Sequence, residues 1–165
     1  MSSLKELFEE YKKQLQIGHI QKAYQGILDF MTSLRLHLEK SNSNVSLSSS
    51  IQNYYLEVSY FFIVTEMLKK EKLKIVLFFY HNSFTFDVWL SGNNKAVRKK
   101  FTEKLSPKSL SKFKSSITVN DEFSIVRHTL VDNADFSDSK ALVKKIEKGI
   151  LLFIDNTEKL LTKII

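Results

Sequence analysis

The stretch that most constrains the fold is LKIVLFFYHNSFTFDVWLSG at residues 73–92, where two apolar runs flank a short polar turn. This pattern is typical of a β-hairpin. A turn of two or four residues within 81–84 gives a single pairing register in either case. Because side chains alternate along a strand, that register predicts one apolar face and one mixed face. The apolar face carries the pairs Ile75–Leu90, Leu77–Val88 and Phe79–Phe86, and the mixed face carries Val76, Phe78, Tyr80, Thr85, Asp87 and Trp89.

Length and composition favour a single domain over residues 1–165. A chain of 165 residues with 43% hydrophobic content can build one core and is short for two. Cysteine is absent, which excludes disulfides, thiolate metal ligands and a cysteine nucleophile. The charged N-terminal residues lack the apolar core of a signal peptide, and no apolar run reaches the length of a membrane span. We therefore expect a cytoplasmic protein without membrane contact.

Apolar residues at helical spacing predict helices at both ends of the chain. Residues 1–40 carry two apolar stripes separated by Gly18, and they predict an antiparallel helical hairpin whose first helix is capped by Ser3. Small side chains at Ala23 and Gly26 favour close approach of the two helices. Residues 41–50, SNSNVSLSSS, predict a flexible linker from the helices to the sheet.

A long apolar seam over residues 137–163 predicts a C-terminal helix, capped by Asp135 or Ser137. Gly149 within it indicates close packing or a bend, since glycine weakens a helix interior by about 1 kcal/mol relative to alanine.

The segment between these helices, residues 51–132, predicts a sheet with an inserted basic helix. Alternation from Gln52 predicts a first strand with Tyr55, Glu57 and Ser59 on one face. Residues 123–131 predict a fourth strand with Arg127 and His128 on opposite faces. The expected fold is therefore α+β: an antiparallel sheet of about four strands, packed against the N-terminal helical hairpin and the long C-terminal helix.

Three segments carry a resemblance to a known family: GHIQKAY at residues 18–24, VWLSGNN at 88–94 and TLVDNADFSD at 129–138. The chain resembles a family of small uncharacterised bacterial proteins, a domain of unknown function that shares VWLSGxN and TLVDNxDFSD segments. The resemblance covers nearly the full length and implies a bacterial source and a single α+β domain. It supplies no activity, cofactor or catalytic residue. His19 departs from the acidic residue expected to cap the second helix.

No motif in the sequence specifies an enzyme chemistry, so we assign no catalytic residue, metal ligand or cofactor. The four histidines fall in four different predicted elements, without the spacing of a helical metal site. The one enzyme alternative is a metal-dependent hydrolase of nuclease type, in which Asp87 and Glu57 hold the ion with a nearby lysine. The competing structural interpretation is an ordinary ion pair between Asp87 and Arg127.

The net charge of +7 comes entirely from residues 95–114, which hold eight basic residues and one acid, Glu103. Such a stretch could bind the phosphates of a nucleic acid, with an affinity that falls as salt rises. The alternative is a solvated helix face, because the stretch matches no groove-reading motif. The candidate nucleic-acid-binding residues are Lys95, Arg98, Lys99, Lys100, Lys104, Lys108 and Lys112.

The leading hypothesis is a non-enzymatic protein that binds a small ligand or a protein partner through the mixed face of the sheet. Aromatic surface with a few polar anchors is typical of binding pockets. The competing interpretation is that a helix covers this face and that the residues form its polar edge. The candidate site residues are Tyr55, Glu57, Tyr80, Asp87, Trp89 and Arg127.

Overall fold

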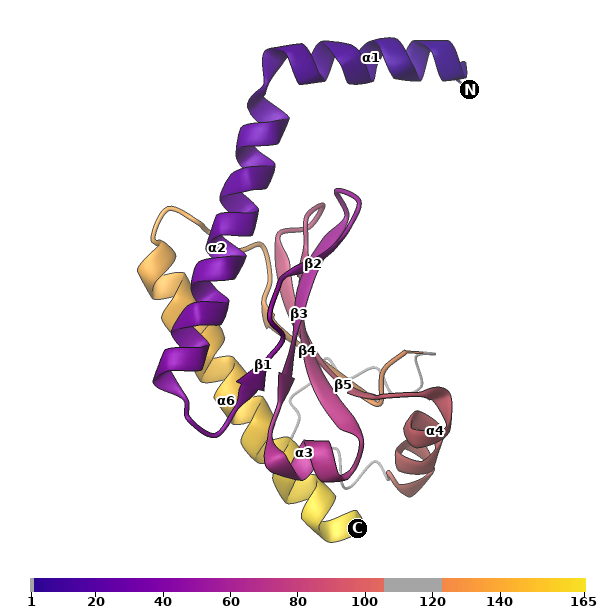
Figure 1. The fold of residues 1–165 in the computed structure, drawn as a ribbon, viewed down its shortest axis with the longest axis vertical. Coiled ribbons are helices and arrows are strands. Elements are labelled where there is room, and N and C mark those ends of the chain that lie inside the picture. Colours follow the sequence, from indigo (N-terminus) through magenta and orange to yellow (C-terminus); the bar gives the residue numbers. More distant parts are fainter. Residues whose placement is uncertain (1, 106–122) are drawn as a thin grey trace.

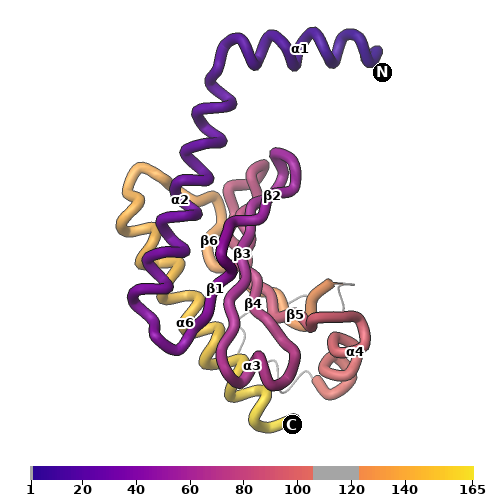
Figure 2. The backbone as a smooth tube through the Cα atoms, viewed as in Figure 1, coloured from indigo at the N-terminus to yellow at the C-terminus, as the bar shows by residue number. Residues whose placement is uncertain are grey.

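The computed structural model describes residues 2–105 and 123–165. It shows an antiparallel sheet with two long helices side by side on one face (Figures 1 and 2). The predicted α+β class, with N-terminal helices, an antiparallel sheet and a C-terminal helix, is confirmed. The helices are α1 (Leu4–Ile17), α2 (His19–Ser41), α3 (Glu66–Lys70), α4 (Lys95–Lys104) and α6 (Ser139–Ile164), and the strands are β1 (Ser46–Leu47), β2 (Gln52–Tyr54), β3 (Val58–Val64), β4 (Leu73–Tyr80), β5 (Thr85–Gly92) and β6 (Val126–Val131).

The sheet is organised around the β4–β5 hairpin. Within the described residues the strand order is β1–β3–β4–β5–β6, with β2 also paired to β3, and every pairing is antiparallel. The predicted register of the hairpin is confirmed, since Ile75 lies opposite Leu90 and Phe79 lies opposite Phe86. The turn uses the four residues 81–84, of which Phe84 has a φ of 53°.

The core lies between the apolar face of the sheet and the helices α2 and α6. Both helices turn an apolar stripe toward the strands, as their spacing predicts. Gly149 lies where α6 crosses β6, because a Cβ at this position would approach Cδ2 of Leu130 to 2.9 Å. The close packing expected at Gly149 is therefore confirmed. The largest buried side chains are Met31, Leu34, Leu38, Phe61, Ile63, Leu68, Leu73, Ile75, Leu77, Phe79, Phe86 and Phe101.

The predicted first strand is in fact two strands joined by a tight turn. β2 and β3 pair with Gln52 opposite Tyr60, and the chain reverses between them at residues 55–57. Tyr55 adopts a left-handed conformation with a φ of 48°, which is uncommon for a residue without a polar side chain able to stabilise it. The alternation predicted across the turn was therefore wrong, and Ser59 faces the core beside Phe79.

The N-terminal helices do not form the predicted antiparallel hairpin. α1 begins with a capping box between Ser3 and Glu6 and ends at Gly18, whose φ is 78°. There the chain changes direction, and α1 extends away from α2 and from the sheet (Figure 1). A Cβ on Gly26 would have no described atom within 4 Å, so the close helix approach expected there is not formed. Gly18 separates the two helices without forcing them together.

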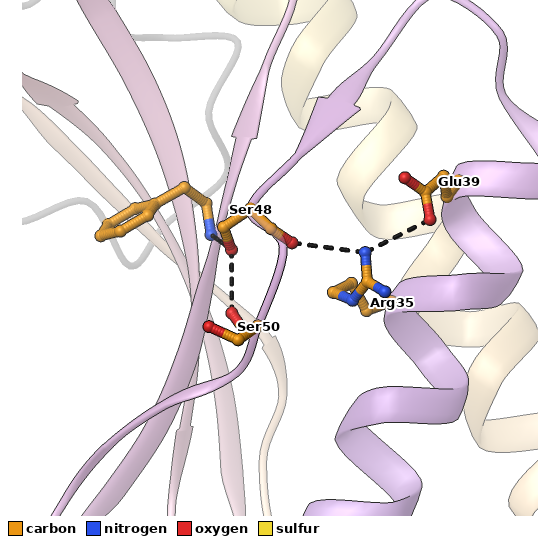
Figure 3. A network of polar contacts seen from close by, with 5 residues as sticks. Arg35, Glu39, Ser48 and Ser50 are labelled. Carbon is orange, nitrogen blue, oxygen red and sulfur yellow. Dashed lines mark hydrogen bonds and ion pairs between the residues drawn. The ribbon is translucent and has the colours of Figure 1, made fainter.

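Residues 41–50, predicted as a flexible linker, include the short strand β1. Figure 3 shows how side chains tie this segment to α2 and β3. Arg35 donates from Nη1 to the carbonyl of Ser48 at 3.3 Å and to Glu39 at 3.2 Å. The hydroxyl of Ser48 accepts the backbone N–H of Phe62 at 3.2 Å and donates to the carbonyl of Ser50 at 3.1 Å. The serines therefore complete the edge of the sheet.

The C-terminal helix starts two residues later than its predicted boundary. Its N-cap is Asp138, which accepts from the N–H of Ala141 at 3.0 Å, whereas Asp135 accepts from the N–H of Ser137 in the preceding turn. The cap predicted at Asp135 or Ser137 is therefore wrong by one to three positions. In the part of the chain that the structure describes, no helix is long and apolar enough to cross a membrane.

Candidate functional site

The mixed face of the sheet carries four of the six residues predicted from the sequence. Asp87 and Trp89 lie on β5 opposite Phe78 and Val76, and β6 places Arg127 beside Trp89. Tyr80 lies at the end of β4 on the same face. The hairpin register placed Tyr80, Asp87 and Trp89 on this face from the sequence, whereas the face of Arg127 was left open.

Asp87 is already engaged by its neighbours on β6. Its exposed fraction is 6%, and its two oxygens accept from the Thr129 hydroxyl at 2.8 Å and from Nη2 of Arg127 at 3.4 Å. These contacts match the ion pair that competes with the metal-binding interpretation. Among the described residues, no group of three or more histidine, aspartate and glutamate side chains is placed to hold a metal ion. The geometry at Asp87 thus gives no support to a metal-dependent hydrolase.

The aromatic side chains of the mixed face pack on one another. Trp89 contacts Phe78 with ring centroids 4.5 Å apart, and the Arg127 guanidinium lies 4.2 Å from the Trp89 ring centroid. Tyr80 stacks on Phe78 at 6.0 Å. Phe78, Tyr80, Trp89 and Arg127 are all half-buried. The face is therefore a packed aromatic layer, with its cation and its acid already paired.

The other two predicted site residues, Tyr55 and Glu57, lie away from this layer. Both belong to the turn between β2 and β3, because the strand predicted through them is broken there. Tyr55 is the most exposed large apolar side chain of the described chain, at 76%. It borders a different surface, which the sequence pattern did not reveal.

That surface, which we name the apolar corner, is formed by residues of α1, of the start of α2 and of the β2–β3 turn. It contains a pocket of about 540 Å³. The pocket is lined by Tyr11, Gln14, Leu15, Ile20, Gln21, Tyr24, Tyr55, Leu56 and Glu57. The apolar corner comprises the apolar residues that line this pocket and the exposed apolar stripe that continues along α1. Its large exposed side chains are Leu4, Leu7, Phe8, Tyr11, Leu15, Ile20, Tyr55 and Leu56.

The stripe on α1 is left largely uncovered by the rest of the described chain. None of the residues of α1, all of which the structure describes, is buried, and Phe8 and Tyr11 are each 63% exposed. Helical periodicity identified these residues as one apolar face. Periodicity alone does not show whether this apolar face is buried or exposed, because a helix that packs on the core has the same pattern.

A second arrangement missed from the sequence joins Ser59, His81 and Asn53. The Ser59 hydroxyl lies 2.8 Å from Nε2 of His81 and 2.7 Å from Oδ1 of Asn53. A serine beside a histidine suggests a nucleophile and its base, but Ser59 is fully buried and has no access to a substrate. The three residues instead fasten β2, β3 and the β4–β5 turn together. Burial lowers the pKa of His81.

The basic stretch is only partly described. Lys108, Lys112 and Lys114 lie outside the described residues, whereas Lys95, Arg98, Lys99, Lys100 and Lys104 lie on α4. Three of these five have polar partners: Lys99 with Glu103 at 3.8 Å, Lys100 with Glu71 at 3.9 Å, and Lys104 with the Ile164 carbonyl at 2.8 Å. Near α4, burial and then the charge of Arg98 lower the pKa of Lys74.

The packing of Trp89 predicts a structural contribution from this side chain. Replacing Trp89 with Ala removes its contacts with Phe78 and Arg127, and we expect the free energy of unfolding to fall by about 2 to 3 kcal/mol in urea denaturation. Thr85→Ala, on the same face but at the turn, is the control and should cost less than about 1 kcal/mol. An unchanged midpoint for Trp89→Ala would instead point to a tryptophan held for binding.

The environment of His81 predicts a loss of stability in mild acid. Because its pKa is lowered in the folded state, the unfolded state binds more protons below its ordinary pKa of about 6.5. The stabilisation is complete above that pH and is lost as the pH falls below it. We expect the free energy of unfolding to decrease between pH 7.5 and 5.5, and His81→Asn to reduce this slope. His19→Asn, at an exposed position, controls for loss of a histidine, and an equal slope in both variants would refute the assignment.

Comparison with known proteins places the chain in a family without assigning it an activity. No curated protein and no solved structure matches it. A model of one protein family matches residues 4–161, which is nearly the whole chain and includes both α1 and the sheet. The chain therefore belongs to the family described as Domain of unknown function (DUF7000).

Proposed function

We propose that the protein acts by binding a protein partner, without catalysis, and that the apolar corner is its binding surface. The observation that carries this proposal is the apolar stripe of α1, whose large side chains are 41% to 66% exposed. An amphipathic helix with no buried side chain contributes nothing to the core, so its apolar face serves another purpose.

The size of the apolar corner supports this proposal. It gathers eight large apolar side chains that are each 41% to 76% exposed, and a grouping of this kind, unlike single scattered apolar side chains, marks interaction sites. The pocket adds concave shape, with Gln14, Gln21 and Glu57 as polar groups at an otherwise apolar lining. An apolar centre with polar groups beside it is the usual composition of a protein interface.

The apolar corner is a better candidate than the mixed face of the sheet. On the mixed face Asp87 is paired with Arg127 and Thr129, and Trp89 is packed between neighbours. Binding there would have to displace contacts that are already made. Binding at the corner only removes water from apolar side chains, which is favourable by about 25 cal/mol for each Å² buried.

Site-specific photo-crosslinking in the producing cells tests the proposal. A benzophenone amino acid at position 8 replaces an exposed aromatic side chain on the stripe, and we expect a discrete crosslinked product on irradiation. The same group at position 13, on the opposite side of α1, is the matched control and should give little product. Equal, diffuse products from both positions, or no product from position 8, would count against a binding surface on α1.

Binding of a phosphate backbone by α4 is the second candidate function. The observation that favours it is the set of five basic residues on α4, with Lys74 nearby; burial first, and then repulsion by Arg98, lower the pKa of Lys74. A bound anion would relieve this repulsion. Two ion pairs, made by Lys99 and Lys100, reduce the charge available on α4, and Lys104 donates to the Ile164 carbonyl.

A mobility-shift titration with short duplex DNA and single-stranded RNA tests this second candidate. Binding should be strongest near 50 mM salt and weaken by at least tenfold at 200 mM. Arg98→Gln should weaken it further, whereas Lys5→Gln on α1 should leave it unchanged. A flat titration at low salt would dispose of the candidate.

A further inference from the structure

We propose that the occupant of the apolar corner is a second copy of this chain, with the N-terminal half of each α1 lying in the pocket of the other. This inference rests on the proposed function and names its partner. It follows from the division of α1 into two halves, from the stability of the isolated helix, and from the shape and charge of the surface.

The two halves of α1 differ in what they contact. The C-terminal half lines the pocket through Tyr11, Gln14 and Leu15, together with residues of α2 and the β2–β3 turn. The N-terminal half extends beyond the pocket and carries Leu4, Leu7 and Phe8, which are 55% to 66% exposed. One half is thus a concave surface, and the other is a convex apolar ridge of the kind that fits a hydrophobic groove.

A two-fold axis between two copies allows the apolar ridge and the pocket of each copy to be covered at the same time. When two α1 helices lie antiparallel, the ridge of each reaches the pocket side of the other, which is the reciprocal arrangement required of a symmetric dimer. A helix of 14 residues is about 21 Å long, so the two contacts fit within one helix length. The antiparallel helix dipoles also attract each other.

The stability of α1 supports an occupant that covers its stripe. Isolated helices shorter than about 12 to 15 residues are marginal in water, and most helices in proteins are stabilised by packing of their apolar face. α1 has its capping box and Gly18 but no buried side chain among its described residues. Covering Leu7, Phe8 and Tyr11 would supply the missing packing.

Shape and charge favour a second copy over a membrane surface. The apolar corner includes a pocket of about 540 Å³, a concave feature that a helix ridge can fill and a flat lipid surface cannot. The whole chain carries a net charge of +7, but the charges on α1 balance. Two α1 helices in contact therefore do not repel each other through a net charge. The charged residues of α1 are Lys5, Glu6, Glu9, Glu10, Lys12 and Lys13. A helix that binds anionic lipid normally has a basic polar face, which α1 lacks.

The mass of the full chain in solution is the first test. Light scattering after size-exclusion chromatography, over roughly 1 to 200 µM, should show a species of twice 19.2 kDa that dissociates on dilution. Phe8→Glu should raise the dissociation constant at least tenfold without changing the thermal midpoint of the dissociated monomer, because Phe8 is exposed there. Lys13→Gln makes the same change in net charge on the opposite face of α1 and should leave the dimer intact.

Disulfide trapping tests the arrangement, since the natural chain has no cysteine to compete. When Phe8→Cys and Gln14→Cys proteins are mixed and mildly oxidised, the antiparallel pair predicts the mixed disulfide in excess over either like pair. An excess of like pairs, or a monomer at 200 µM, would overturn the inference. If the chain is monomeric and position 8 crosslinks to a different protein, the dimer inference fails and the proposed function stands. If neither a dimer nor a crosslink forms, the dimer inference and the proposed function both fail.

Discussion

The pairing of β4 with β5 is the interaction on which the rest of the structure depends. Its register assigns alternate side chains of residues 73–92 to opposite sides of the sheet, so a shift of one residue would exchange the core with the mixed face. The strands β3 and β6 then extend the same pattern on either side. The apolar face that results is broad enough for both α2 and α6, and nothing of it is left for α1.

This allocation of surface explains why the apolar corner is left exposed and is the proposed binding surface. α2 packs on the sheet through its C-terminal half, where Met31, Leu34 and Leu38 are buried, while its first turns extend past the sheet. α1 is joined to that projecting end, so its apolar stripe cannot reach the core. An apolar stripe at helical spacing is buried in α2 and exposed in α1. The two stripes differ because α2 lies against the sheet and α1 does not.

Sequence reasoning was accurate where local and long-range patterns agreed. The hairpin register followed from alternation on both strands. The ion pair of Asp87 with Arg127 was only an alternative interpretation, because the pattern left open which face of the last strand points inward; the pairing of β5 with β6 has a register shift between Phe86 and Asp87 and places Arg127 beside Trp89. It failed at residues 55–57, because Tyr55 enters a left-handed conformation without the glycine or asparagine that usually marks such a turn. It also failed at Gly18, since a helix cap specifies where a helix ends and leaves the direction of the next helix open. These two errors hid the apolar corner, which is built from the two segments concerned.

The edge of β3 has a consequence for how exposed apolar surface is tolerated. β2 pairs with residues 58–60 and β1 with residues 63 and 64, while the hydroxyl of Ser48 takes the intervening N–H of Phe62. A long strand edge would offer a continuous row of backbone groups to any other chain, and such rows promote the growth of fibrils. Here the row is divided among two short strands and one side chain. Backbone pairing with another molecule, which would extend without limit, is therefore restricted at this edge. The proposed contact between two copies would instead use side chains on a helix, where the assembly can close.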